Sequence, residues 1–252
     1  MAVTATPIEI PAPGGGAINA HLYAPEREPD AAPDVLVLMD APGVRPALHG
    51  MAARLAAAGY RALLPNLYWR RLRDSGFDRA AFSREGDPER ERIFALARGY
   101  GHAEFRADLG PMLDALGATA AAPAAAVGYC MSGRFALQAL AEAPERVAAA
   151  ASFYGTRLAT EAPDSPHRWL PGLQRGEAYL CFAEHDPYVP PGVPPQVEDA
   201  MRRSAIPHRI EHYAGTHHGF AQPDGGGFDP VAAERHWAAL LDLLSRVPRR
   251  PR

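Results

Sequence analysis

This sequence contains three side chains that could act together in nucleophilic catalysis. They are the thiol of Cys130, the carboxylate of Asp186 and the imidazole of His218. A thiol attacks a carbonyl carbon well only after it has lost its proton. An imidazole can remove that proton and later protonate a leaving alcohol, while a carboxylate fixes the imidazole tautomer and stabilises its cation. Each of the three follows a stretch that predicts a strand, and the carboxyl ends of parallel strands meet at one edge of a sheet. We therefore expect the three side chains to converge and to support acyl transfer.

Cys130 lies at a predicted turn between a strand and a helix. Residues 124–127 are small and apolar, as in a buried strand of a parallel sheet, and residues 134–140 predict a helix. Gly128 and Gly133 flank the cysteine, and a nucleophile exposed on a strained strand–turn–helix elbow needs such small neighbours. The start of a helix also favours the thiolate form of a cysteine. The alternative interpretation is a buried structural cysteine in the turn.

The nucleophile, acid and histidine follow one another along the chain in the order found in α/β hydrolases. Two neighbouring residues offer alternative assignments, His217 as the base and Glu184 as the acid. A metal site built from His212, His217, His218 and Glu184 is a further alternative, although their spacing matches no compact zinc signature.

The composition excludes several other kinds of chemistry. All 26 basic residues are arginines, so the chain has no lysine for a Schiff base, a phosphate-binding loop or a Ser–Lys dyad. The formal net charge of −3 indicates no basic surface for nucleic acid, and no apolar stretch reaches the roughly 18 residues of a membrane span.

The two cysteines form no disulfide framework and no signal peptide is evident, so we expect a cytoplasmic protein. The expected partner is a small molecule, not nucleic acid or a membrane, and the expected assembly is a monomer or a small homo-oligomer.

Strands and helices alternate along most of the chain, which predicts an α/β fold. Residues 7–23 contain a glycine turn and predict an antiparallel hairpin. Residues 66–101 are longer than an ordinary connection, and we expect either a cap on the substrate side, with a short helix near 88–98, or a solvated excursion without a role. Residues 248–252 are expected to be a disordered tail. The prediction is a single α/β-hydrolase domain over residues 1–252, with a mostly parallel central sheet and helices on both faces.

Further elements are predicted from the spacing of apolar residues. Strands are expected at 35–39, 61–65, 147–154, 177–183 and 208–213, and helices at 48–58, 105–116, 197–204 and after Asp229-Pro230.

The same motifs resemble those of the dienelactone hydrolase family, cysteine-dependent members of the α/β-hydrolase fold. The similarity covers about residues 7–246, and its elbow is specific because cysteine is uncommon in that position among α/β hydrolases. The matching pieces are Gly128-Tyr129-Cys130 with Gly133, Glu184-His185-Asp186-Pro187, His218-Gly219-Phe220, Asp40-Ala41-Pro42-Gly43-Val44 and Ser152-Phe153-Tyr154-Gly155.

The resemblance implies a catalytic triad of Cys130, His218 and Asp186, and the His-Gly-Phe pattern favours His218 over its neighbour as the base. It also implies an oxyanion hole formed by the backbone N–H groups of Ala41 and Met131. Such donors stabilise the developing negative charge by about 3 kcal/mol each.

Three further residues are expected to contact the substrate or the resting nucleophile. The family has an acidic residue, usually glutamate, that pairs with the resting nucleophile at the position of Asp40. Tyr154 stands at a matching strand end. Gln222 lies close to where the dienelactone-cleaving members have an arginine that binds the substrate carboxylate. Because that cation is missing here, dienelactone itself is not the expected substrate.

We therefore expect a hydrolase that cleaves a carboxylic ester or lactone through an acyl-thioester intermediate, without a metal or an organic cofactor. Amide and thioester substrates stay open. A catalytically silent binding or regulatory protein of the same fold is the alternative from another class. A redox-sensing thiol is a third possibility, for which Cys181, on a different strand, is a poor resolving partner.

Overall fold

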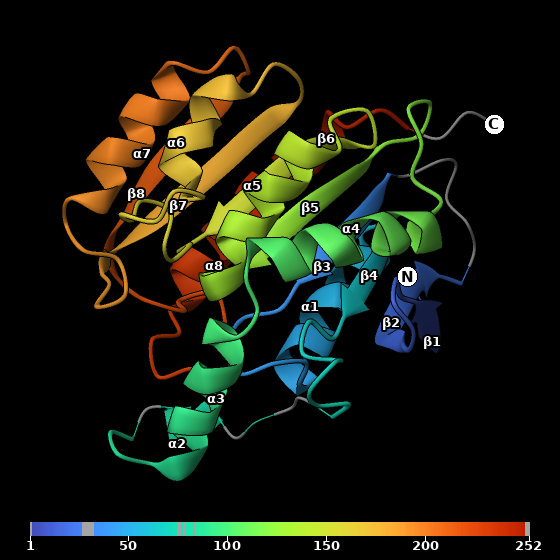
Figure 1. Ribbon diagram of the computed structural model, residues 1–252, viewed down its shortest axis with the longest axis horizontal. Coiled ribbons are helices and arrows are strands. Elements are labelled where there is room, and N and C mark those ends of the chain that lie inside the picture. Colours follow the sequence, from blue (N-terminus) through green and yellow to red (C-terminus); the bar gives the residue numbers. More distant parts are fainter. Residues whose placement is uncertain (1, 27–32, 75–76, 78, 83, 250–252) are drawn as a thin grey trace.

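The computed structural model describes residues 2–26, 33–74, 77, 79–82 and 84–249. Within these ranges, eight strands form one continuous sheet (Figure 1). The strands are β1 (Val3–Pro11), β2 (Ala17–Pro25), β3 (Asp34–Leu38), β4 (Arg61–Pro65), β5 (Ala124–Tyr129), β6 (Val147–Phe153), β7 (Glu177–His185) and β8 (His208–His217).

The order across the sheet is β1-β2-β4-β3-β5-β6-β7-β8. β2 pairs antiparallel with β1 and with β4, and all other neighbours pair in parallel. The predicted fold class is confirmed: an α/β-hydrolase fold with a mostly parallel central sheet, helices on both faces and an N-terminal antiparallel hairpin. The predicted tail falls partly outside the described residues, which end at 249.

The helices pack on the two faces of this sheet. In Figure 1, α4 and α5 lie in front of the sheet and α8 behind it. The helical segments are α1 (Pro46–Ala57), α2 (Arg79–Phe82), α3 (Pro88–Arg98), α4 (His102–Leu116), η1 (Cys130–Ser132), α5 (Gly133–Glu142), α6 (Pro166–Trp169), η2 (Leu170–Gly172), α7 (Val193–Arg202) and α8 (Pro230–Ser245).

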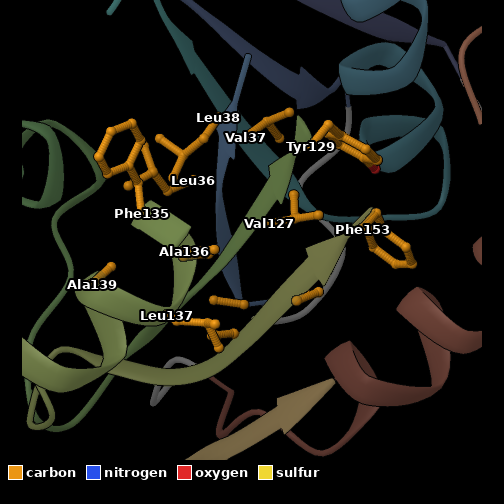
Figure 2. Packing of buried hydrophobic residues seen from close by; sticks show 14 of the residues in the cluster. Leu36, Val37, Leu38, Val127, Tyr129, Phe135, Ala136, Leu137, Ala139 and Phe153 are labelled. Carbon is orange, nitrogen blue, oxygen red and sulfur yellow. The ribbon is translucent and has the colours of Figure 1, made fainter. Parts of the chain in front are cut away.

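The centre of the core lies where α5 crosses the parallel strands. All residues of β3 and β5 are buried, because both faces of these strands are covered. Figure 2 shows the packing, with Phe135 of α5 beside Leu36 of β3, and Val127 of β5 near Tyr129 and Phe153. The helix that begins at the elbow is thereby fixed on a buried apolar face.

The segment 66–101 holds α2 and α3, which extend away from the sheet at the bottom of the view in Figure 1. Its two ends are tied to Asp108 of α4. The Asp108 carboxylate accepts hydrogen bonds from Trp69 Nε1 at 3.1 Å, from Arg70 at 2.7 and 2.8 Å, and from the Tyr100 hydroxyl at 3.0 Å. This segment of residues 66–101, which we call the insertion, therefore extends from a base fixed on α4.

Several element boundaries differ from the predictions. β8 continues beyond the predicted end at Tyr213 as far as His217, because β7 also runs on to His185 and pairs with it across an irregularity. α7 begins at Val193 and not at residue 197, because prolines, which fit the first turn of a helix, extend it at its start. α6 and η2 lie between β6 and β7, in a stretch where no helix was predicted.

The start of α8 is confirmed: Asp229 accepts from the backbone N–H groups of Val231 and Ala232, both at 2.9 Å. The predicted helix near 88–98 is confirmed as α3.

Candidate active site

Cys130 follows the last residue of β5 and adopts a backbone conformation that few non-glycine residues adopt, with φ at 56°. Such a conformation costs about 1–3 kcal/mol and persists only where the surrounding structure imposes it. A Cβ atom on Gly128 would lie 2.0 Å from the carbonyl oxygen of Ser132, and one on Gly133 would lie 2.4 Å from the Ser152 hydroxyl. The two glycines therefore allow the turn to close, as the elbow motif predicts.

His218 lies between Cys130 and Asp186. Its Nδ1 is 2.7 Å from Oδ2 of Asp186, and the other carboxylate oxygen accepts from the backbone N–H of Tyr188 at 2.9 Å. Nε2 of His218 is buried without a nitrogen or oxygen partner among the described residues, and it faces the sulfur of Cys130. The rings of Tyr188 and Tyr154 pack edge-on against the imidazole, with centroids at 4.8 and 5.1 Å. The structure thus brings the three predicted side chains together and restricts the imidazole from both sides.

The surroundings of His218 favour its charged form. Burial alone would lower its pKa, but the charge of the Cys130 sulfur and the hydrogen bonds to Asp186 and Cys130 outweigh this effect and raise the pKa of His218 to about 10. His218 therefore keeps its proton at neutral pH, between Asp186 and the Cys130 side chain.

The neighbouring residues considered as alternatives lie elsewhere. The rings of His217 and His185 are tilted against each other, with centroids 5.1 Å apart, and the two residues pair in the sheet. Glu184 is exposed and accepts from the backbone N–H of Gly215 at 2.6 Å, and His212 pairs with Glu198 at 2.7 Å. Within the described ranges, no group of three or more His, Cys, Asp and Glu side chains is arranged to hold a metal ion.

Asp40 and Gln222 share a buried polar cluster around Arg45. The guanidinium contacts both oxygens of Asp40, at 2.5 and 3.0 Å, both oxygens of Asp224, at 2.6 and 3.2 Å, and Oε1 of Gln222 at 3.4 Å. Burial alone would lower the pKa of Arg45, but Asp40 and Asp224 raise it above its ordinary value. This cation was not singled out in the sequence, and it is balanced by two carboxylates. A resting-state contact between Asp40 and Cys130 stays a prediction.

A cavity of about 180 Å³ opens beside Cys130. The insertion supplies one wall of it, and the elbow and the ends of other strands supply the rest. The lining residues are Phe82, Phe94, Ala97 and Arg98 from the insertion, Cys130, Met131 and Arg134 from the elbow, and Ala41, Thr156, Arg157 and Tyr188. Gln222 and Tyr154 are fully buried outside this lining, Tyr154 behind the imidazole. A larger cavity of about 480 Å³ lies by α4, α5 and α6 and contains none of the three candidate catalytic residues.

Tyr68 connects the two residues expected to form the oxyanion hole. Its buried hydroxyl donates to the carbonyl oxygen of Ala41 at 3.0 Å and lies 3.2 Å from the sulfur of Met131. Burial and the charges of Asp40 and Cys130 raise the pKa of Tyr68 well above its ordinary value, so the hydroxyl keeps its proton. Tyr68 was not predicted as a site residue, because only the folded chain brings residues 41, 68 and 131 together.

Cys181, the second thiol, lies inside β7 and is 1% exposed. Burial raises the pKa of its thiol above the ordinary range. It is a core residue and not a reactive one.

The sequence pattern of the Dienelactone hydrolase family matches residues 18–247, nearly the whole chain. The chain belongs to the dienelactone hydrolase family. This confirms the family predicted from the motifs and the prediction of a carboxylic ester or lactone hydrolase.

Two curated relatives have similar lengths. A carboxymethylenebutenolidase from Pseudomonas sp. is 26% identical over 249 residues, covering 95% of this chain and 94% of that protein. Carboxymethylenebutenolidase 1 from Cupriavidus pinatubonensis is 26% identical over 245 residues, covering 95% and 96%.

Solved structures share the fold. A dienelactone hydrolase-like promiscuous phosphotriesterase from metagenomic libraries superposes with a TM-score of 0.78 at 24% identity, covering 98% of this chain and 99% of that one. The dienelactone hydrolase from Anabaena variabilis gives a TM-score of 0.60 at 22% identity, covering 98% of this chain and 99% of that one.

None of the helices in the described part of the chain has the length and apolarity needed to cross a membrane.

Proposed function

We propose that the protein hydrolyses a small carboxylic ester or lactone through an acyl-thioester on Cys130. The observation that carries the proposal is the position of His218, whose Nδ1 is 2.7 Å from Asp186 and whose Nε2 faces the Cys130 sulfur. Nucleophile, base and acid occupy the ends of β5, β8 and β7, where sites form in parallel sheets. The strained conformation of Cys130 supports the same assignment, because it exposes a nucleophile above the sheet.

The reaction follows from these contacts. The Cys130 thiolate attacks the substrate carbonyl carbon, and the backbone N–H groups of Ala41 and Met131 bind the oxyanion that forms. The tetrahedral intermediate collapses with cleavage of the carbon–oxygen bond, and Nε2 of His218 donates its proton to the leaving alcohol. A water molecule then attacks the thioester while the neutral imidazole accepts its proton. The acid product leaves, and the thiolate and imidazolium are restored.

The charge state of His218 suits the first of these steps. With its pKa raised to about 10, the imidazole carries at neutral pH the proton that the leaving alcohol needs. Asp186 holds the ring through Nδ1, so the mobile proton is on the nitrogen that faces the substrate.

Residues around the triad are proposed to position it. Tyr154, with φ at 39°, packs its ring against His218 and keeps the imidazole plane fixed. Asp40 and Gln222 stabilise the loop that contains Ala41 through Arg45, and a direct contact of Asp40 with the thiol remains part of the proposal. Both cysteines are free, which suits a reducing compartment and the proposed cytoplasmic location.

Steady-state hydrolysis of p-nitrophenyl acetate and butyrate tests the proposal. Cys130→Ala should reduce turnover by at least about a thousandfold, since removal of a catalytic nucleophile abolishes covalent catalysis. Cys181→Ala is the matched control, because it removes the other thiol and leaves the site intact. A folded wild type without turnover, or equal turnover in wild type and Cys130→Ala, would favour a catalytically silent member of the fold.

A further inference from the structure

A second cavity, which contains none of the three candidate catalytic residues, lies where α5 contacts α4 and α6 (Figure 1). Its volume of about 480 Å³ is in the range of pockets that hold small organic ligands, whereas the cavity beside Cys130 has about 180 Å³. The surface of the second cavity is mostly apolar, with contributions from Leu140, Ala141, Trp169 and Leu173. It therefore has the size and the surface of a ligand site, and its polar groups decide which ligand fits.

The side-chain amide of Gln138 fixes the tautomer of a histidine in this cavity. Gln138 is 2% exposed, and its Nε2 donates to two acceptors, the carbonyl oxygen of His102 and the carboxylate of Glu142, both at 2.9 Å. Its Oε1 therefore faces Nδ1 of His102, at 2.6 Å. Because an amide oxygen can only accept a hydrogen bond, Nδ1 of His102 must carry the proton.

His102 consequently offers a hydrogen-bond acceptor. Burial lowers the pKa of His102 below its ordinary value, so the ring is uncharged at neutral pH. In an uncharged imidazole with its proton on Nδ1, the other nitrogen, Nε2, has only a lone pair. Nε2 is not among the buried polar atoms, and no described residue donates to it. Since His102 lines the cavity, this lone pair is available to a ligand.

The charged groups of the cavity largely balance one another. Arg106 donates to Glu142 at 2.6 and 3.0 Å, and Arg175 pairs with Glu145. Asp164 is exposed to solvent, and its charge favours the cation of Arg106. A charged ligand would compete with these interactions, so the cavity favours an uncharged one.

Trp169 gives the cavity an aromatic wall. Its Nε1 donates to the carbonyl oxygen of Asp164 at 3.1 Å, which holds the indole in place. The indole lies edge-on to the His102 ring, with centroids 6.4 Å apart. An aromatic ligand gains about 0.5–1.5 kcal/mol from contact with such a ring, beyond the area that it buries. The acceptor and the indole are thus close together in one cavity.

We propose that this cavity binds an uncharged aromatic molecule whose ring carries a hydroxyl or an N–H group. That group donates to Nε2 of His102, and the ring packs against Trp169 and the apolar side chains of Leu140 and Leu173. The site is separate from the proposed catalytic site, and its occupation does not depend on hydrolysis.

Two naphthalenes of similar size test the acceptor. At neutral pH, 2-naphthol has a hydroxyl donor that 2-methoxynaphthalene lacks, and isothermal titration calorimetry measures the binding of each. 2-Naphthol should bind about tenfold more tightly, the effect of one hydrogen bond. His102→Phe should remove this preference. His208→Phe, the control at an exposed histidine outside the cavity, should keep it.

Two further changes locate the binding. Ala141→Phe places a ring in the cavity and should prevent binding of both naphthalenes, which keeps the test decisive if His102→Phe does not fold. Alkylation of Cys130 by iodoacetamide occupies the smaller cavity and should leave both affinities unchanged.

Four results would overturn the inference. They are equal affinity or no binding of the two naphthalenes in wild type, an unchanged preference in folded His102→Phe, unchanged binding in Ala141→Phe, and loss of binding after alkylation of Cys130. The contacts of Gln138 with His102 would then be only a structural connection between α5 and α4.

Discussion

Gly128→Ala should collapse the elbow on which the site depends. The added Cβ would lie 2.0 Å from the carbonyl oxygen of Ser132, 2.5 Å from its carbonyl carbon and 2.9 Å from the nitrogen of Gly133. All three neighbours are backbone atoms at the start of α5, so no side-chain rotation can relieve the contact. Overpacking of this kind commonly costs 1–3 kcal/mol, and contact with backbone places the expected loss at about 3 kcal/mol. For a chain of this length that corresponds to a melting temperature lower by about 6–12 °C.

Urea denaturation and the rate of iodoacetamide alkylation at Cys130 measure the two consequences, lower stability and a displaced thiol. Gly50→Ala is the matched control, because a Cβ there meets nothing within 4 Å and the residue lies inside α1. That substitution should stabilise the protein by about 0.5–1 kcal/mol through its helix propensity. A Gly128→Ala protein with wild-type stability and alkylation rate would refute the steric account of the elbow.

Three other predictions follow from the buried charges and thiols. Arg45→Met leaves Asp40 without its cation and should lower the free energy of unfolding by about 3–5 kcal/mol in urea denaturation, with partial recovery on adding Asp40→Asn. The pKa of His218 is raised from 6.5 to about 10, so its stabilisation is complete below pH 6.5 and is lost as pH rises through about 10. The difference in unfolding free energy between wild type and His218→Gln should therefore shrink over that interval, and a constant difference would contradict the assignment. Iodoacetamide should label one thiol per native chain, at Cys130, and a second label on Cys181 by intact mass would show that β7 opens.

The elbow turn and the placing of residues 130, 186 and 218 at one edge of the sheet could be predicted from sequence, because local sterics and strand order specify them. Only small residues fit at Gly128 and Gly133, so the turn is visible in the residue types alone. Parallel strands bring their carboxyl ends to one edge, which places residues 130, 186 and 218 together whatever their separation. The end of β8 was predicted four residues early, yet His218 still follows directly after the strand, and His217 remains within it.

The charge distribution around the nucleophile could not be predicted in the same way. Arg45 and Asp224 are 179 residues apart, and no periodic pattern connects them. Arg134 follows the elbow glycine at a position that could equally face solvent. Its burial depends on the packing of α5 against the sheet and of Tyr100 from the insertion, which are long-range contacts. Tyr68 contacts Ala41 and Met131 for the same reason.

The central claim is covalent catalysis by Cys130, and intact mass of the enzyme quenched during turnover of p-nitrophenyl butyrate tests it most directly. The expected result is the added mass of one butyryl group, located by peptide mapping on Cys130. It should accumulate further in His218→Gln, where deacylation lacks its base and the nitrophenolate leaving group needs no proton. Turnover without any acyl mass in either protein, or with the acyl group on another residue, would contradict the account.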